Sequence, residues 1–262
     1  MCNRRRSVSA ARALAVPLAT AALALLLAAP TLAAPPTAAD RELLTAADIG
    51  RAMPTAFRST LRVEPLAGPG AQSFEVWRDA TLALVRFLDP KQKGKAFLQR
   101  PEGTWLLTRG ARPVRLGTAS RVVAGLSLQE LVGLAYSRDF TIENVARQGA
   151  GATTIVSFTL RAKAADLPYP LATYVVREAT RRPVRVEYRL ANGRLVRMVE
   201  MVAWRPGAKL VPAETIAKDL VGGRTPLRVR LLAVDERKPP AHLFELTPAG
   251  DAARAALPSP TS

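Results

Sequence analysis

Residues 183–194 read Pro-Val-Arg-Val-Glu-Tyr-Arg-Leu-Ala-Asn-Gly-Arg, and this stretch decides the fold class. From Val184 to Leu190, apolar side chains alternate with arginine and glutamate. Alternation with a period of two is typical of a strand with one apolar, buried face and one polar, solvent-exposed face. Asn192-Gly193 is the preferred pair for a two-residue hairpin turn, and another β-rich run, Arg194–Trp204, follows it. The stretch therefore predicts an antiparallel hairpin that packs through one face.

Similar β-rich runs, separated by turn residues, recur on both sides of this hairpin. The run Thr225–Asp235 repeats the alternation, with Leu227, Val229 and Leu231 opposed to Arg228 and Arg230. Many short strands joined by short turns indicate an antiparallel meander, open or partly closed into a barrel. The other expected strands are Leu61–Glu64, Gln72–Trp77, Thr81–Leu88, Lys95–Arg100, Thr104–Thr108, Pro113–Leu116, Thr153–Arg161, Thr173–Arg177 and Leu210–Ile216.

Two parts of the chain have helical patterns instead. Residues 40–53 carry apolar residues near helical spacing, which predicts one or two helices that end before Pro54. Ser127-Leu128-Gln129-Glu130 has the form of a capping box and opens an apolar segment, which predicts a helix from Leu128 to Tyr136. These helices must bury their apolar faces, and the concave face of the sheet is the available surface. We therefore expect an α+β fold that is mostly β.

The first 33 residues resemble a secretory signal peptide. Four arginines (Arg4, Arg5, Arg6 and Arg12) precede an apolar run from Ala13 to Ala29, and Thr31-Leu32-Ala33 offers small residues for cleavage after Ala33. The alternative is an uncleaved anchor, but Pro17 interrupts the run, which is short for a spanning helix of about 20 residues. We expect residues 34–262 to form one domain in the periplasm.

Composition excludes several classes of chemistry from this domain. Cys2 is the one cysteine, so the secreted part has no disulfide, thiol nucleophile or cysteine metal site. His242 is the one histidine, no glycine-rich phosphate loop precedes a helix, and no G-x-S-x-G motif occurs. We therefore predict no metal, no cofactor and no enzymatic activity. A pair of acidic residues in a polar cavity is the alternative that would indicate an enzyme.

The domain is strongly basic. Loss of the four signal arginines leaves a net charge of +13 from the +17 of the whole chain. A positive surface favours anionic lipid head groups or nucleic acid. Secretion makes nucleic acid a poor partner, so we expect none. The other interpretation is solvated charge on the outer faces of strands.

From about Phe74 to Gly250, the order and spacing of several segments resemble one family. Leu84–Leu98 is similar to that family's strand, proline turn and Lys-Gly opening of the next strand, and Trp105-Leu106-Leu107 to its tryptophan strand. Pro183–Arg194 resembles its hairpin, Gly222–Thr225 its glycine turn, and Phe244–Pro248 its terminal segment. The chain thus resembles the LolA-like outer-membrane lipoprotein-sorting protein family.

The resemblance implies an open antiparallel half-barrel whose concave apolar face is covered by helices. It also implies a periplasmic carrier that takes up acyl chains of lipid or lipoprotein between sheet and helices and delivers them toward the outer membrane. The implied partners are this cargo, an inner-membrane exporter and an outer-membrane acceptor, and we expect a monomer. Because a carrier must release its load, residues Gly125–Arg138 are the candidate lid.

The candidate cavity residues are apolar or aromatic. Ordinary core packing is the alternative for all of them, because carrier and core positions share the same alternation. Alternative functions are a lipoprotein-sensing regulator of the same fold, an accessory protein of a membrane lipid exporter, and a protein that binds another protein. The candidates are Trp77, Leu84, Phe97, Trp105, Leu107, Leu131, Leu134, Val186 and Tyr188.

Overall fold

The computed structural model describes residues 35–117, 120–123, 125–165, 167–207 and 211–246. The predicted signal peptide, residues 1–33, lies outside the described residues, and its cleavage stays a prediction. Leu210 of one expected strand and the last two residues of the Phe244–Pro248 segment also lie outside them. The single domain expected over residues 34–262 likewise stays a prediction.

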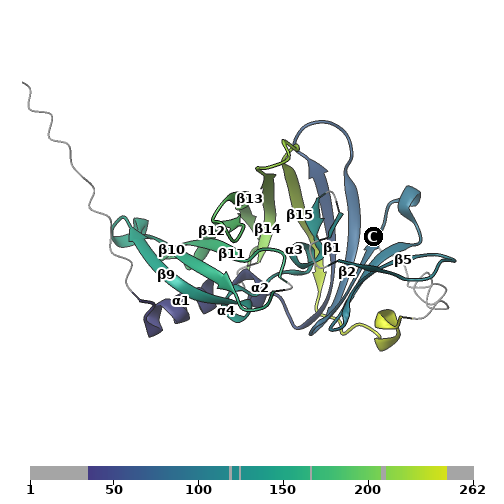
Figure 1. Cartoon of the computed structure of the whole chain (residues 1–262), viewed down its shortest axis with the longest axis horizontal. Helices are drawn as coiled ribbons and strands as arrows, with labels where there is room; N and C mark the ends of the chain where they lie inside the picture. Colours follow the sequence, from purple (N-terminus) through teal and green to yellow (C-terminus); the bar gives the residue numbers. More distant parts are fainter. Residues whose placement is uncertain (1–34, 118–119, 124, 166, 208–210, 247–262) are drawn as a thin grey trace, which may run out of the picture. The chain divides into compact units, whose positions relative to one another are not determined.

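One curved sheet of 13 antiparallel strands forms most of the described chain (Figure 1). Its order is β6-β5-β4-β3-β2-β1-β15-β14-β13-β12-β11-β10-β9, and it ends at β6 and β9 without closing. The open, mostly antiparallel architecture expected from the sequence is thus confirmed. The strands are β1 (Ala56–Pro65), β2 (Gln72–Asp79), β3 (Leu82–Phe87), β4 (Lys95–Arg100), β5 (Gly103–Thr108), β6 (Val114–Leu116), β9 (Phe140–Gln148), β10 (Ile155–Ala162), β11 (Leu171–Arg177), β12 (Arg182–Arg189), β13 (Leu195–Trp204), β14 (Pro212–Asp219) and β15 (Leu227–Asp235).

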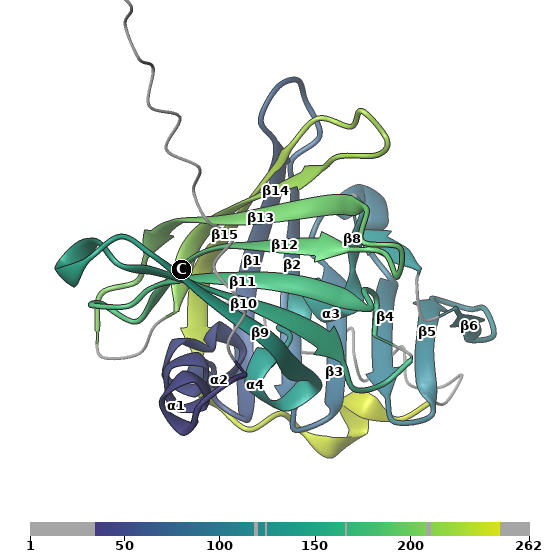
Figure 2. The same ribbon diagram turned by 60° about the vertical axis from the view of Figure 1, so that its left-hand side comes forward.

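The sheet consists of two meanders joined in the middle. Strands β1 to β6 follow one another, β9 to β15 follow one another, and β15 pairs with β1. Between the meanders the chain leaves the sheet and forms the small hairpin β7 (Arg121–Val123) and β8 (Leu126–Ser127), then α3 (Leu128–Val132) and α4 (Tyr136–Asp139). Figures 1 and 2 show α3 inside the curve of the sheet, so this connection covers the concave face.

Two helices precede β1, as the sequence predicts. Thr37 caps α1 (Ala38–Ala47) in a capping box with Asp40. Asp48 ends α1 and caps α2 (Ile49–Ala52), which stops before Pro54. Short 3₁₀ turns complete the helical content, namely η1 (Pro90–Gln92), η2 (Gly151–Thr153) and η3 (Ala241–Phe244).

The single helix expected from Leu128 to Tyr136 is wrong. Ser127 and Glu130 do form the predicted capping box, but α3 ends at Gly133, whose φ is 90°. Glycine adopts this left-handed conformation without a Cβ clash, so it is well suited to end a helix. The chain restarts as α4 three residues later.

Strand β12 follows its predicted alternation only in part. Val186 and Tyr188 are buried, and Arg185, Glu187 and Arg189 form ion pairs on the other face. Val184 does not share the buried face, because a bulge places Pro183 opposite Val176 and Arg185 opposite Val175. Pro183 is buried in its place.

The apolar residues divide between the two faces of the sheet. On the first meander, Val76, Val85, Phe97 and Leu106 are successive cross-strand partners on the face that α3 covers. Their neighbours along the chain form a parallel row on the opposite face, where η3 packs through Leu243 and Phe244. That row is Trp77, Leu84, Leu98 and Trp105.

Candidate functional site

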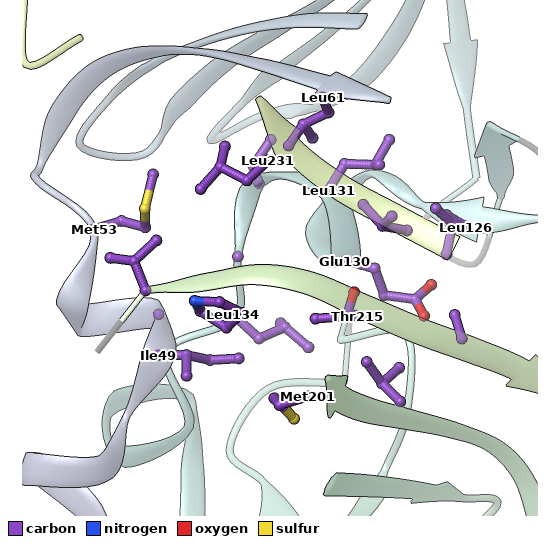
Figure 3. A pocket seen from close by; sticks show the side chains of 18 of the residues that line it. Ile49, Met53, Leu61, Leu126, Glu130, Leu131, Leu134, Met201, Thr215 and Leu231 are labelled. Carbon is purple, nitrogen blue, oxygen red and sulfur yellow. The ribbon is translucent and has the colours of Figure 1, made fainter. Parts of the chain in front are cut away.

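A cavity of about 160 Å³ lies between the concave face of the sheet and the helical connection (Figure 3). Strands β1 and β12 to β15 supply its floor, because alternate residues of each strand point to this side. Residues 126–136 and α2 form its roof. The floor residues are Phe57, Ser59, Leu61, Tyr188, Val199, Met201, Pro212, Thr215, Ala217, Val229 and Leu231, and the roof residues are Ile49, Gly50, Leu126, Glu130, Leu131, Val132, Gly133, Leu134 and Tyr136, with Met53 and Val211 at the side.

The charged group on the roof is neutralised. The Glu130 carboxylate of α3 lies 2.5 Å from Nε of Arg197 on β13, and both side chains are at most 5% exposed. Glu130 also accepts the backbone N–H of Ser127 at 2.7 Å, and Arg197 donates to the carbonyl of Gly125 at 3.2 Å. The pair therefore ties α3 to the sheet and leaves the rest of the cavity mainly apolar.

All four tyrosines of the chain pack in one buried cluster, and two of them, Tyr136 and Tyr188, line the cavity. The hydroxyls of Tyr136 and Tyr188 are 2.6 Å apart, Tyr188 stacks on Tyr169, and Tyr174 donates to the carbonyl of Ala47 at 2.8 Å. Burial raises the pKa of Tyr136, Tyr174 and Tyr188 well above the usual value of 10.0. These phenols are therefore neutral at physiological pH, and Tyr136 and Tyr188 present hydrogen-bonded, largely apolar rings to the cavity.

Two more contacts hold the roof in place. Asp48 accepts the backbone N–H of Ser137 at 2.8 Å and its hydroxyl at 2.7 Å, which joins α2 to α4. Burial raises the pKa of Asp48, although these hydrogen bonds partly offset that effect. On the other side, Arg78 of β2 donates to the carbonyl of Val132 at 2.7 Å. The proposed lid segment, Gly125–Arg138, is thus anchored from both sides in this structure.

The structure brings three of the predicted cavity residues to this site. Leu131 and Leu134 lie in its roof and Tyr188 in its floor. Phe97 and Val186 are buried on the same face but in the surrounding core rather than in the cavity wall.

The other four predicted residues lie away from the cavity. Trp77, Leu84, Trp105 and Leu107 pack with η3 on the opposite face of the sheet. Strands β2 to β5 are apolar on both faces, so the sequence pattern alone does not distinguish the face that α3 covers. Sequence reasoning missed most of the floor, although the alternation of Leu227, Val229 and Leu231 was a signal for it.

Several solved structures share this architecture. A LolA superfamily protein from Nitrosomonas europaea superposes with a TM-score of 0.69 at 14% identity, over 78% of this chain and 97% of that one. The chain has a LolA-like fold. A provisionally assigned outer membrane lipoprotein-sorting protein domain from Vibrio parahaemolyticus (TM-score 0.60, 13% identity, 78% and 95% coverage) and a DUF1329 family protein from Desulfovibrio piger (0.63, 14%, 81% and 98%) share it.

The LolA-like fold is the extent of this similarity. No family model matches the sequence, and no curated protein matches it either. None of the helices in the described part of the chain is long and apolar enough to span a membrane. Within the described ranges, no three His, Cys, Asp or Glu side chains are grouped to share a metal ion.

Proposed function

We propose that this protein is a periplasmic carrier that holds an acyl chain of a lipid or lipoprotein in the cavity and passes it toward the outer membrane. The observation that carries the proposal is the apolar cavity between the concave sheet and the segment 125–138. Each CH₂ group that moves from water into such a cavity contributes roughly 0.8 kcal/mol, so an acyl chain binds without any specific polar contact.

The size of the cavity supports a lid that moves. A volume of about 160 Å³ is close to that of an apolar cavity that admits a benzene ring, roughly 150 Å³, and too small for a long acyl chain. An acyl chain would need more room than this. The roof is the part of the cavity wall that can supply it, because α3 and α4 are short helices that are not hydrogen-bonded into the sheet. We therefore propose that residues 125–138 swing outward when cargo enters. We also propose that this protein acts as a carrier without a catalytic role.

Organic extraction of the protein purified from a periplasm tests the proposal directly. Mass spectrometry of the extract should reveal a stoichiometric lipid or acylated peptide. Val229→Trp, in the cavity floor, should reduce this load severalfold because the indole occupies the same space. Val202→Trp is the matched control, because Val202 is 51% exposed and does not line the cavity.

Two results together would contradict the carrier proposal. The first is an empty extract from the wild-type protein. The second is a failure of the same protein to bind a fluorescent fatty acid. In that case a regulatory or protein-binding role would be the better hypothesis.

A further inference from the structure

A second hollow of about 300 Å³ lies on the far side of the lid from the apolar cavity. Val132, Gly133 and Leu134 line both, so a single stretch of backbone separates them. We call the second hollow the basic pocket, because Arg78, Arg138 and Lys163 line it. Its size falls within the roughly 300–1,000 Å³ of ordinary ligand pockets.

The basic pocket carries an excess of positive charge. Among the described residues that line it there are three cationic side chains and one carboxylate, Asp139. Thr81, Gln99 and Gln129 add neutral hydrogen-bonding groups. The lining therefore offers donors and positive charge to a ligand that is small and negative.

Two of the cations have no carboxylate partner in the part of the chain that the structure describes. Arg78 donates to the carbonyls of Ala80 and Val132, and Lys163 to the carbonyl of Arg138. Only Arg138 forms an ion pair there, with Asp139 at 2.6 Å. Burial and then the charge of Arg138 lower the pKa of Arg78, and the charge of Asp139 offsets this only in part.

We infer that the basic pocket binds the phosphate of an anionic lipid whose acyl chain occupies the apolar cavity. This inference rests on the proposed function and narrows its cargo. An N-terminal cysteine that is fully acylated carries no anion, so it would leave the pocket's charge uncompensated. When residues 125–138 swing outward as proposed above, a lipid with a phosphate head can place its charge at Arg78, Arg138 and Lys163 and its chain on the other side of Val132–Leu134.

Ligands that share one acyl chain test this inference. Lysophosphatidic acid carries a phosphate, monoacylglycerol of the same chain length does not, and glycerol 3-phosphate has the head without the chain. We expect lysophosphatidic acid to displace a fluorescent fatty acid about tenfold more tightly than monoacylglycerol, the value of one charge-assisted contact. Glycerol 3-phosphate should not displace it and should bind weakly in calorimetry.

Lys163→Gln is the informative variant, because Lys163 contacts one backbone carbonyl and no described carboxylate. It should lower the affinity for lysophosphatidic acid severalfold and leave that for monoacylglycerol unchanged. Lys95→Gln, on the exposed end of β4 and outside the basic pocket, removes the same charge and should change neither affinity.

The other outcomes separate the two proposals. Equal binding of both lipids, unaffected by Lys163→Gln, would overturn the phosphate site and leave the carrier function standing. Binding of neither lipid would overturn both. Tight binding of glycerol 3-phosphate alone would identify a site for free phosphate compounds instead of a lipid head group.

Discussion

The buried pair of Glu130 and Arg197 is the residue-scale feature on which the roof depends most. Arg197→Met leaves the Glu130 carboxylate without its cation in a site where both side chains are at most 5% exposed. Removing one partner of a buried pair costs about 3–5 kcal/mol. We expect urea denaturation to show a loss of that size in the free energy of unfolding, with part of it recovered in Arg197→Met/Glu130→Gln.

Arg185→Met is the matched control for Arg197→Met. Arg185 pairs with Glu187 at 2.8 Å, but its side chain is 41% exposed. Exposed pairs contribute about 0–1 kcal/mol, so this variant should be nearly neutral. Equal losses for Arg197→Met and Arg185→Met would show that the buried pair does not hold the roof.

At the scale of elements, α2 and the lid meet at a contact that only glycine permits. A Cβ atom at Gly50 would lie 1.9 Å from the carbonyl oxygen of Leu134, so α2 or the lid backbone must shift. Overpacking of this kind costs about 1–3 kcal/mol. We expect Gly50→Ala to lower the free energy of unfolding by that amount and to change fatty-acid binding, because both residues line the cavity.

Gly117→Ala shows whether that loss comes from the close contact. The nearest atom to a Cβ at Gly117 is Oγ of Ser120 at 3.8 Å, an ordinary contact distance. A loss as large as that of Gly50→Ala would indicate a general cost of replacing glycine in this chain.

Strands with one solvent-exposed face were predictable from the sequence, even where a bulge interrupts the alternation as in β12, whereas the edge strand β9 was not. The alternation in β12 and β15 and the capping box at Ser127 predicted strands and a helix start that the structure contains. Strand β9 was missed because the bulge at Glu143 puts Val145 out of phase with Phe140 and Ile142.

The candidate site was less predictable than the fold, because the sequence does not show which face of each strand is concave. Its roof follows from one apolar segment, which correctly supplied Leu131 and Leu134. Its floor depends on which face of each strand is concave. Trp77 and Val76 are adjacent on β2 and both buried, so only the curvature of the folded sheet distinguishes them.

For the whole molecule, the sheet ends at two edge strands, β6 and β9, which have no strand on their outer side within the described residues and could pair with another copy. Strand β6 is only three residues long. Strand β9 carries Glu143 at its bulge, where it pairs with Arg161, and Arg147, which binds Asp40 of α1 at 2.5 Å. Short strands, bulges and charges all discourage edge pairing. We therefore expect a monomer in sedimentation velocity.

Glu143→Val tests whether the charged bulge protects this edge. Valine favours strand pairing and removes the charge, so the variant should show association that increases with protein concentration. Glu200→Val is the control, because the Glu200 side chain is similarly exposed (34% against 35%) and ion-paired, but lies on β13 between two paired strands. Association of both variants would point to general loss of surface charge. A monomeric Glu143→Val would show that the shape of the edge, rather than its charge, keeps two sheets apart.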